Sequence, residues 1–261
     1  MRERAAELVR GRAGGADLVV LPELFASLGR RRAMVEAAEP LDGPTVGWAS
    51  ALARQTGAWL VAGSFVERAE DGRLFNTSPL LAPDGRLAAH YRKVHLFDVT
   101  VDGATNRESD TFASGEGPVV SPLDSLPGSP RLGLTVCYDL RFPELYRIEA
   151  LLGAAVVAVP AAFTAATGRA HWDLLARTRA VENTTAVVAA DQWGEGPNGI
   201  VSHGHSMIVD AWGTVLAEAP EEGDTVVTAE LDLGAQAELR ERLPSLANRR
   251  PAAYRWPDAE G

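Results

Sequence analysis

The sequence predicts a mixed α/β fold, and three features of the chain lead to that prediction. Apolar segments of strand length alternate with helical segments in both halves of the chain, which is typical of α/β folds. Turn signals interrupt the alternation with hairpins, which favours mixed sheets with helices packed outside them. The strands are short and apolar, which indicates burial on both faces. With no internal repeat and no linker-like stretch, the 261 residues are expected to form one domain, 1–261.

Hydrophobic periodicity gives the elements of the first half in order. The chain is expected to form helices over 2–13 and 45–55 and strands over 17–21, 58–63, 74–81 and 86–93. Pro83-Asp84-Gly85 is a strong turn signal, so the last two strands are expected to pair as a hairpin. The polar stretch 98–116 is expected to be an irregular loop, and loops of that length usually have a function.

The second half continues the alternation and then turns to hairpins. Its expected strands are 131–136, 154–159, 185–190, 206–210, 214–218 and 225–231, and its expected helices are 143–152, 169–182 and 234–242. Trp212-Gly213 is expected to join the strands on either side of it. A tail rich in Arg and Pro follows the last helix.

Composition and charge exclude several classes of protein. Hydrophobic residues make up 46% of the chain and charged residues 23%, which supports a sizeable core and argues against disorder. The formal net charge of −10 argues against a nucleic-acid or anionic-membrane partner. The single cysteine excludes an internal disulfide and the common zinc ligand sets. No stretch approaches the roughly 20 apolar residues of a membrane span, and the charged amphipathic start is no signal peptide, so a cytoplasmic enzyme is expected.

Cys137, the single cysteine, is the most informative residue. It follows the apolar run 131–136 and is followed at once by the polar, turn-forming segment 138–144. A thiol at the carboxyl end of a buried strand, directly before a helix start, is well placed as a nucleophile, because free N–H groups there favour the thiolate and can bind an oxyanion. The alternative is a buried, inert thiol, which is the commoner state of a lone cysteine.

Two other polar residues lie where a strand ends and the chain turns. Glu23 follows the apolar run 18–22, and Lys93 ends the second hairpin strand. Carboxyl ends of neighbouring strands are where α/β folds collect active-site groups. A carboxylate, an ammonium and a thiol form a workable set of base, oxyanion stabiliser and nucleophile. Each residue alone is also explained as a helix-start charge, an edge residue or a core atom.

Several motifs, taken in order, resemble those of the nitrilase superfamily of carbon–nitrogen hydrolases. The motifs are Pro22-Glu23, 91–97 (YRKVHLF), 137–145 (CYDLRFPEL), 160–163 (PAAF), 168–172 (GRAHW), 177–182 (RTRAVE), 204–210 (GHSMIVD) and 212–215 (WGTV). They cover nearly the whole chain. Their wording is most similar to the Nit branch, which includes omega-amidase and deaminated glutathione amidase.

The resemblance implies a four-layer α-β-β-α sandwich of nitrilase type and a catalytic triad of Glu23, Lys93 and Cys137. It also implies a second glutamate that fixes the lysine, and Glu108 matches that position. The implied reaction is the hydrolysis of a small linear amide to a carboxylic acid and ammonia through a thioester, with no metal and no organic cofactor. Within the superfamily, the alternatives are an N-carbamoyl amino acid hydrolase and a nitrilase. A non-catalytic ligand-binding member is less favoured, because Glu, Lys and Cys are all present.

Five residues are candidates for contact with the substrate. They are Tyr138, Arg141, Phe163, Thr164 and His171. The backbone N–H of Tyr138 is implied as an oxyanion donor. Arg141 is expected to brace the nucleophile turn through Glu144 or Asp139, with a substrate carboxylate as the alternative partner. Core packing or a helix cap explains Phe163 and Thr164 as well as pocket lining does, and packing equally explains His171.

Histidine-based sites are weighed against this interpretation. A papain-like thiol hydrolase needs a Cys–His pair, for which His95 and His171 are weak candidates. His203 and His205 have a spacing that suits a metal on a strand, but no cysteine or carboxylate accompanies them, so no metal is expected.

The resemblance also bears on the N-terminus and on assembly. Members of the superfamily usually begin with a strand ahead of the first helix, whereas this chain opens in that helix. We therefore expect unpaired backbone groups in one sheet, and a start upstream of Met1 or a truncated N-terminus. The family tends to dimerise through the helices that flank the nucleophile. A homodimer through 143–152 and 169–182 is therefore expected, and the tail 249–256 is a candidate to reach across its interface.

Overall fold

The computed structural model describes residues 1–101 and 104–253, and its elements follow the predicted order closely. The helices are α1 (Arg2–Arg12), α2 (Arg31–Glu36), α3 (Pro44–Thr56), α4 (Pro143–Leu151), α5 (Ala165–Asn183) and α6 (Leu233–Arg242), with 3₁₀ helices η1 (Glu108–Asp110), η2 (Cys137–Arg141) and η3 (Pro251–Ala253). The first eight strands are β1 (Leu18–Val20), β2 (Trp59–Val61), β3 (Phe65–Arg68), β4 (Leu74–Leu81), β5 (Leu87–Arg92), β6 (Asp98–Val101), β7 (Ala104–Arg107) and β8 (Val119–Pro122). The others are β9 (Arg131–Leu134), β10 (Ala154–Ala161), β11 (Ala186–Asp191), β12 (Trp193–Glu195), β13 (Val201–His203), β14 (Met207–Val209) and β15 (Val215–Glu218).

Two sheets dominate the structure. The first has the strand order β1-β2-β4-β3, with β5 paired to β4, and the second has the order β15-β14-β11-β10-β9-β8. β1–β2 and β9–β10–β11 are parallel, while the hairpin strands are antiparallel. The predicted mixed α/β fold is therefore confirmed, and so is the hairpin between β4 and β5.

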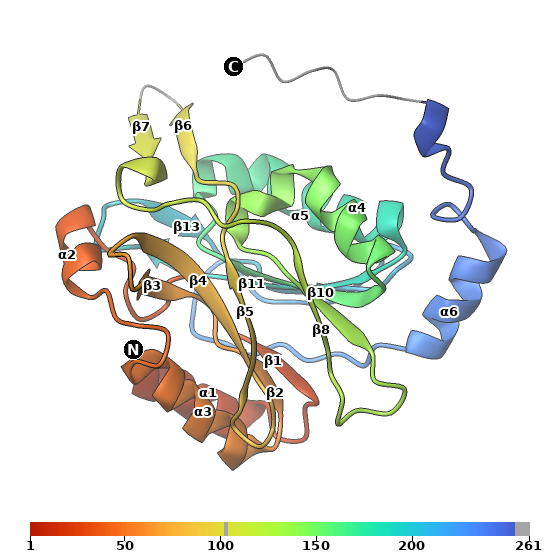
Figure 1. The fold of residues 1–261 in the computed structure, drawn as a ribbon, viewed down its shortest axis with the longest axis horizontal. Helices are drawn as coiled ribbons and strands as arrows, with labels where there is room; N and C mark the ends of the chain where they lie inside the picture. Colours follow the sequence, from red (N-terminus) through yellow and green to blue (C-terminus); the bar gives the residue numbers. More distant parts are fainter. Residues whose placement is uncertain (102–103, 254–261) are drawn as a thin grey trace.

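The core explains how the two sheets and the helices are stacked. α1 and α3 bury Ala6, Val9 and Leu52 against the outer face of the first sheet. A second cluster joins the inner face of the first sheet, through residues such as Trp59, to the second sheet and to α4 and α5, which include Trp172. Figure 1 shows the same arrangement, with α1 and α3 outside one sheet and α4 and α5 outside the other. The polar ends of the strands of both sheets therefore meet between the helical layers.

Helix boundaries follow local chemistry. α3 and α4 each begin with a proline at the first helical position, where the missing N–H costs nothing. α3 ends at Gly57, whose φ of 69° lies in the left-handed region that glycine adopts without strain. α5 starts at Ala165, four residues earlier than predicted, so the GRAHW segment lies inside the helix.

The stretch 98–116 is more ordered than the sequence predicts. β6 and β7 pair as an antiparallel hairpin, and η1 follows directly. The β-branched residues Val99, Thr100 and Thr105 favour this pairing, although the polar composition of the stretch hides it. The prediction of an irregular loop is wrong for 98–101 and 104–110, and the hairpin leads straight into Glu108.

The strand predicted at 225–231 is absent from the described part of the chain, where these residues belong to no ladder. A strand needs a hydrogen-bonded neighbour. Residues 225–229 instead line a cavity together with β1, which is an edge strand bonded to β2 alone. Among the described residues, β1 has a strand neighbour on one side only.

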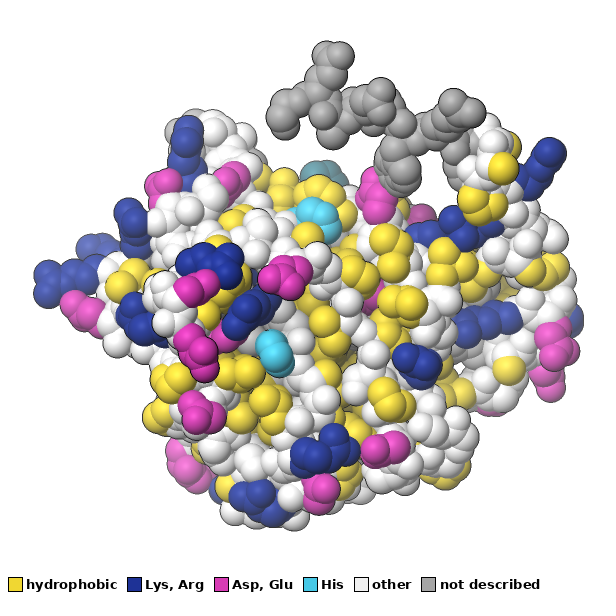
Figure 2. Space-filling view, in the orientation of Figure 1, with side chains coloured by type: hydrophobic (Ala, Val, Ile, Leu, Met, Phe, Trp, Pro, Cys, Tyr) yellow, Lys and Arg dark blue, Asp and Glu magenta, His cyan; other side chains and the backbone are white. Residues whose placement is uncertain are grey.

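The surface is mixed in charge on the face drawn in Figure 2. Acidic and basic side chains are interspersed there, and hydrophobic side chains lie between them across the middle of the face. No helix of residues 1–101 and 104–253 is long and apolar enough to cross a bilayer.

Candidate active site

A small cavity lies where strand ends of the two sheets meet. Its volume is about 70 Å³, and its lining includes Glu23, Lys93, Glu108 and Cys137. Lys93 directly follows β5, while Glu23 and Cys137 each lie three residues after the last residue of β1 and β9, so three separate strand ends supply the set. The structure thus brings together the four residues that the sequence and the resemblance single out.

Glu23 is held in place by donors from both sheets. Its Oε1 accepts from Lys93 Nζ at 2.9 Å and from Asn76 Nδ2 at 2.8 Å. Its Oε2 accepts from the backbone N–H of Ala162 at 2.9 Å, and its backbone oxygen accepts from Gln192 Nε2 at 2.7 Å. The side chain is only 4% exposed. The carboxylate is therefore fixed in one orientation beside the cavity.

Lys93 lies between two carboxylates and is 1% exposed. Its Nζ is 2.8 and 3.0 Å from the two oxygens of Glu108, as well as bonded to Glu23. Burial opposes the charge of Lys93, but the carboxylates of Glu108 and Glu23 outweigh burial and raise the pKa of Lys93 well above its usual value. Lys93 is therefore a permanently charged ammonium at neutral pH.

Glu108 is the outer partner of the lysine. Besides Lys93, its Oε2 accepts from the backbone N–H of Phe97 at 2.7 Å. Burial raises the pKa of Glu108, and the charge of Lys93 opposes that rise. Glu108 and Glu23 thus both hold the ammonium, which leaves the ammonium little freedom to move.

Cys137 is the first residue of η2 and has a φ of 49°, in the left-handed region that non-glycine residues rarely adopt. Burial raises the pKa of its thiol well above the usual value, and the charge of Glu23 adds to that rise while Lys93 opposes it. The expectation that the helix start favours the thiolate is therefore outweighed by burial. The thiol is protonated at neutral pH and needs a base.

The turn that carries Cys137 is closed by Asp139, whose side chain is fully buried. Asp139 Oδ2 accepts from the backbone N–H of Val136 at 2.8 Å. The same carboxylate accepts from Tyr91 Oη at 2.9 Å and lies 2.8 Å from His95 Nδ1. His95 is thus bonded to Asp139 and is not a base paired with Cys137, as a papain-like site requires.

The substrate-binding candidates divide into two groups. Tyr138, Phe163 and Thr164 line the small cavity with the charged residues. Arg141 and His171 are not among its lining residues in the described part of the chain. Their roles in binding substrate stay predictions.

The predicted brace between Arg141 and an acidic neighbour is wrong. Asp139 is already occupied by other donors, and the described residues contain no ion pair between Arg141 and Glu144. A guanidinium nitrogen of Arg141, Nη1, instead lies 3.3 Å from His171 Nδ1, and the guanidinium carbon is 5.2 Å from the ring centre of Phe163. Its charge is left available at the surface beside the cavity.

Sequence reasoning missed two residues that orient Glu23. Asn76 lies in β4 with buried residues on both sides, and Gln192 directly follows β11. A polar side chain inside an apolar strand is the signal for Asn76, because such a side chain needs a buried partner. Gln192 carries no comparable signal.

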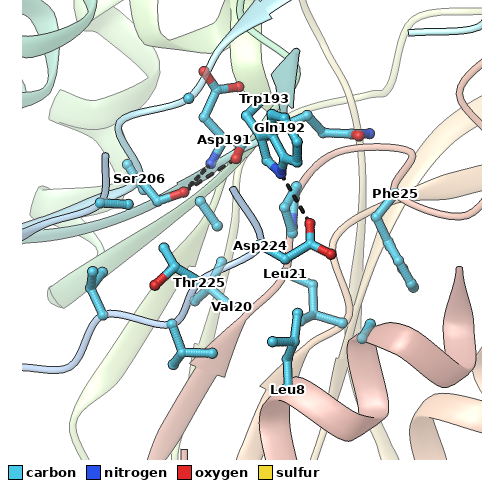
Figure 3. Close-up of a pocket in the computed structure, with 18 of the residues that line it drawn as sticks. Leu8, Val20, Leu21, Phe25, Asp191, Gln192, Trp193, Ser206, Asp224 and Thr225 are labelled. Carbon is cyan, nitrogen blue, oxygen red and sulfur yellow. Dashed lines mark hydrogen bonds between the residues drawn. The ribbon is translucent and has the colours of Figure 1, made fainter. Parts of the chain in front are cut away.

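A second, much larger cavity lies apart from the charged residues. It has a volume of about 710 Å³ and is lined by α1, β1, β11, β14 and the segment 223–229. Figure 3 shows the apolar side chains of Leu8, Leu21 and Phe25 around it, and Asp224, another lining residue, hydrogen-bonded to Trp193 at 3.0 Å. Glu23, Lys93 and Cys137 are absent from its described lining.

Comparison with known proteins gives a consistent result. The family model described as carbon-nitrogen hydrolase matches residues 1–241. The chain is 43% identical to the deaminated glutathione amidase of Synechocystis over 239 residues, which cover 90% of this chain and 86% of that protein. It is 39% identical to human omega-amidase NIT2, covering 96% of this chain and 90% of that protein. The structure of Saccharomyces cerevisiae Nit3, a member of branch 10 of the nitrilase superfamily, aligns with a TM-score of 0.80 and 33% identity over 93% of this chain and 88% of that one.

Proposed function

The chain belongs to the carbon–nitrogen hydrolase family, and we propose that it is an amidase that hydrolyses a small linear amide to a carboxylic acid and ammonia. One observation supports this most strongly. A buried ammonium, Lys93, lies between Glu23 and Glu108 in the cavity that also holds the thiol of Cys137. Such a set supplies a base, a fixed positive charge and a nucleophile within one small space.

In the first step, Glu23 takes the proton of the Cys137 thiol while the sulfur attacks the amide carbon. Burial keeps the thiol protonated in the free enzyme, so attack requires a base. Glu23 is suited to this role because its carboxylate is held by Asn76 and Ala162 and cannot turn away. The carbonyl C=O bond opens, and its electrons move to the oxygen.

The negative oxygen that forms is stabilised by Lys93 and by the backbone N–H of Tyr138. Both groups border the cavity, and the ammonium is already oriented by two carboxylates. A pre-oriented donor of this kind is worth about 3 kcal/mol in comparable sites. Glu108 acts through the lysine and is therefore a positioning residue.

The second half of the reaction returns the enzyme to its starting state. Glu23 gives the proton to the amide nitrogen, the C–N bond breaks, and ammonia leaves a thioester on Cys137. Glu23 then takes a proton from water, whose oxygen attacks the thioester carbon. The C–S bond breaks, the carboxylic acid leaves, and the thiol regains its proton.

The substrate class is proposed from the relatives and from the geometry beside the cavity. Two relatives are named deaminated glutathione amidase and omega-amidase. A cavity of about 70 Å³ suits a small group such as a primary amide. The charge of Arg141, stacked over Phe163, is a candidate partner for a carboxylate at the other end of the substrate. Hydrolysis of an N-carbamoyl amino acid or a nitrile is the alternative.

The predicted homodimer stays a proposal, supported by exposed apolar side chains on α4 and α5. Ile148 and Leu151 on α4 and Leu152 directly after it are 45–48% exposed, and Leu174 on α5 is 62% exposed. Dimerisation removes such surface from water. The proposed reach of the tail 249–256 concerns residues that lie partly outside the described ones. The cytoplasmic location also stays a prediction.

The test is ammonia release from a panel of compounds by the purified protein. The panel contains alpha-ketoglutaramate, deaminated glutathione, glutamine, simple aliphatic amides, N-carbamoyl amino acids and nitriles. We expect turnover of at least one amide, and a fall in kcat of about a thousandfold or more in Cys137→Ala. Thr105→Ala changes an exposed residue of β7 and is the control for effects of mutagenesis and purification. Its kcat should equal that of the parent protein.

Two results contradict the proposal. An amidase activity that survives in Cys137→Ala would remove the cysteine from the chemistry. Turnover of nitriles or N-carbamoyl compounds alone would keep the cysteine and replace the substrate class. Thermal unfolding of each protein, measured in parallel, shows that the comparison is made between folded chains.

A further inference from the structure

One buried carboxylate connects the lysine strand to the nucleophile turn, and the proposed function gives it no role. Asp139 is 0% exposed, and each of its oxygens has two partners. Oδ2 accepts from Tyr91 Oη at 2.9 Å and from the backbone N–H of Val136 at 2.8 Å. Oδ1 accepts from the backbone N–H of His95 at 3.1 Å and lies 2.8 Å from the ring Nδ1 of His95.

The partners on one side belong to the segment that carries Lys93. Tyr91 precedes the lysine by two residues, and His95 follows it by two. The hydroxyl of Tyr91 also accepts from the backbone N–H of Val94 at 3.1 Å. The ring of His95 is stacked on Phe142, with 3.6 Å between ring centres. Asp139 therefore holds the backbone immediately before and after the lysine.

The partner on the other side belongs to the turn that carries Cys137. Val136 directly precedes the cysteine, and Asp139 follows it by two residues. The φ of 49° at Cys137 is a costly conformation that persists only where surrounding contacts impose it. The bond from Val136 to Asp139 closes the turn across this residue.

No sheet ladder links the two segments. Lys93 follows β5 of the first sheet, whereas Cys137 follows β9 of the second, and these strands pair only within their own sheets. Facing sheets are held together by side-chain packing, which fixes distances less strictly than hydrogen bonds do. The carboxylate of Asp139 supplies directional bonds to both segments at once.

We propose that Asp139 is a positioning residue that sets the placement of Cys137 relative to Lys93. This inference rests on the proposed function, because it assigns the two residues to one reaction. Catalysis of this kind depends on the reacting groups being placed to within a fraction of an ångström. Asp139 acts on the reaction only through its hold on the two segments.

The test compares two buried tyrosines that differ in their connection to Asp139. Tyr91 and Tyr146 are 0% and 2% exposed, and each makes a side-chain hydrogen bond, Tyr91 to Asp139 and Tyr146 to Thr135 at 3.0 Å. Tyr91→Phe and Tyr146→Phe each remove one buried hydroxyl and leave the ring in place. The measurements are kcat and KM on the amide found in the panel, the rate of Cys137 alkylation by iodoacetamide, and the urea midpoint of unfolding.

We expect Tyr91→Phe to lower kcat by about tenfold to a hundredfold with KM little changed, because the reacting groups lose their alignment. Tyr146→Phe should keep kcat close to that of the parent. The urea midpoint of unfolding should fall by a similar amount in the two variants, because each loses one buried hydroxyl. Alkylation of Cys137 should change in Tyr91→Phe only. Equal loss of kcat in the two variants would overturn the proposal, because it would reduce Tyr91 to a stabilising residue.

Asp139→Asn and the double variant Asp139→Asn/Tyr91→Phe sharpen the test. If the tyrosine acts through the carboxylate, the double variant should lose no more kcat than Asp139→Asn does. Additive losses would show that Tyr91 acts independently and would also overturn the proposal. If Asp139→Asn does not fold, the two tyrosine variants still decide the question. The proposed function fails separately, since its failure is activity that survives in Cys137→Ala.

Discussion

The two cavities of this molecule differ in size and in chemistry. The small one has about 70 Å³ and is bordered by one thiol, one ammonium and two carboxylates, all largely buried. The large one has about 710 Å³ and is walled mainly by apolar side chains, with the Arg4–Asp224 ion pair exposed near its edge. The candidate chemistry lies in the cavity that is a tenth the size of the other. Convergence of buried charge, and not volume, distinguishes the candidate catalytic cavity here.

The physical reason is the cost of burying charge. An ionised group in the interior is tolerated only when partners compensate for its lost hydration. Lys93, Glu23 and Glu108 compensate one another, and a network of this kind is fixed before substrate arrives. The large cavity contains no such network in its described lining, and it borders the unpaired edge of β1.

The largest expected difference between the cavities comes from removing one cation from each. Lys93→Met leaves two carboxylates facing each other without a counter-charge, so kcat should fall by about a hundredfold or more. The free energy of unfolding should fall by about 3–5 kcal/mol, because the remaining charges are buried. Arg4→Met removes a cation whose side chain is 57% exposed, and it should cost under about 1 kcal/mol and leave kcat unchanged.

Ammonia-release kinetics and urea unfolding of the two variants measure these effects. A Lys93→Met enzyme with parental kcat would contradict the assignment of the small cavity. A large loss of kcat in Arg4→Met would place part of the reaction at the large cavity.

Filling each cavity with a larger side chain should have smaller effects, which impair substrate binding at the small cavity and stabilise the fold at the large one. Thr167 lines the small cavity, and Thr167→Phe should raise KM by about tenfold or more, because the ring takes space that the substrate needs. Ala5 lines the large cavity from α1, and Ala5→Leu should raise the free energy of unfolding by up to about 1 kcal/mol through added apolar burial. Steady-state kinetics and thermal unfolding test both; unchanged KM in Thr167→Phe would exclude this cavity as the substrate site.

The sequence predicts the strands of the small cavity well because they carry their own signals. Short apolar runs that end in Glu23, Lys93 and Cys137 identify three strand ends, and the resemblance adds Glu108. Hydrophobic periodicity cannot predict that these residues meet in one cavity, because that depends on how the two sheets face each other. Asn76 shows the same limit, since its partner Glu23 is 53 residues away in the chain.

The sequence predicts the region of the large cavity poorly, because residues with the composition of a strand lack a hydrogen-bonded strand neighbour there. The residues 225–231 have the composition of a strand, yet composition does not provide a neighbour. The hairpin of β6 and β7 is the reverse case. Its polar composition predicts a loop, yet the two segments pair as antiparallel strands. The predicted ion pair of Arg141 is wrong for another reason. Its expected partner Asp139 already accepts hydrogen bonds from distant segments.

The finest distinction between the cavities is the direction in which each shifts a carboxyl pKa. Burial raises the pKa of Glu108 above the ordinary 4.5, whereas the bonds from Arg4 and Trp193 lower the pKa of Asp224 below the ordinary 3.8. As pH falls, Glu108 therefore takes up its proton first and stops balancing the charge of Lys93. The stability that Asp224 contributes is present above pH 3.8 and is lost as pH falls through its lowered pKa in the folded state. The pKa of Glu108 is raised on folding, so its contribution to stability declines as pH rises from 4.5 through that raised pKa.

The acid limb of kcat/KM should therefore lie above pH 4.5 in the parent enzyme and move to lower pH in Glu108→Gln. Asp224→Asn should leave the limb where it is, because that carboxylate belongs to the other cavity. Profiles of kcat/KM between about pH 4 and 8 for the three proteins give the answer. A limb that stays in place in Glu108→Gln would show that Glu108 remains ionised throughout. Its hold on Lys93 would then be constant with pH, and the acid loss of activity would arise elsewhere in the small cavity.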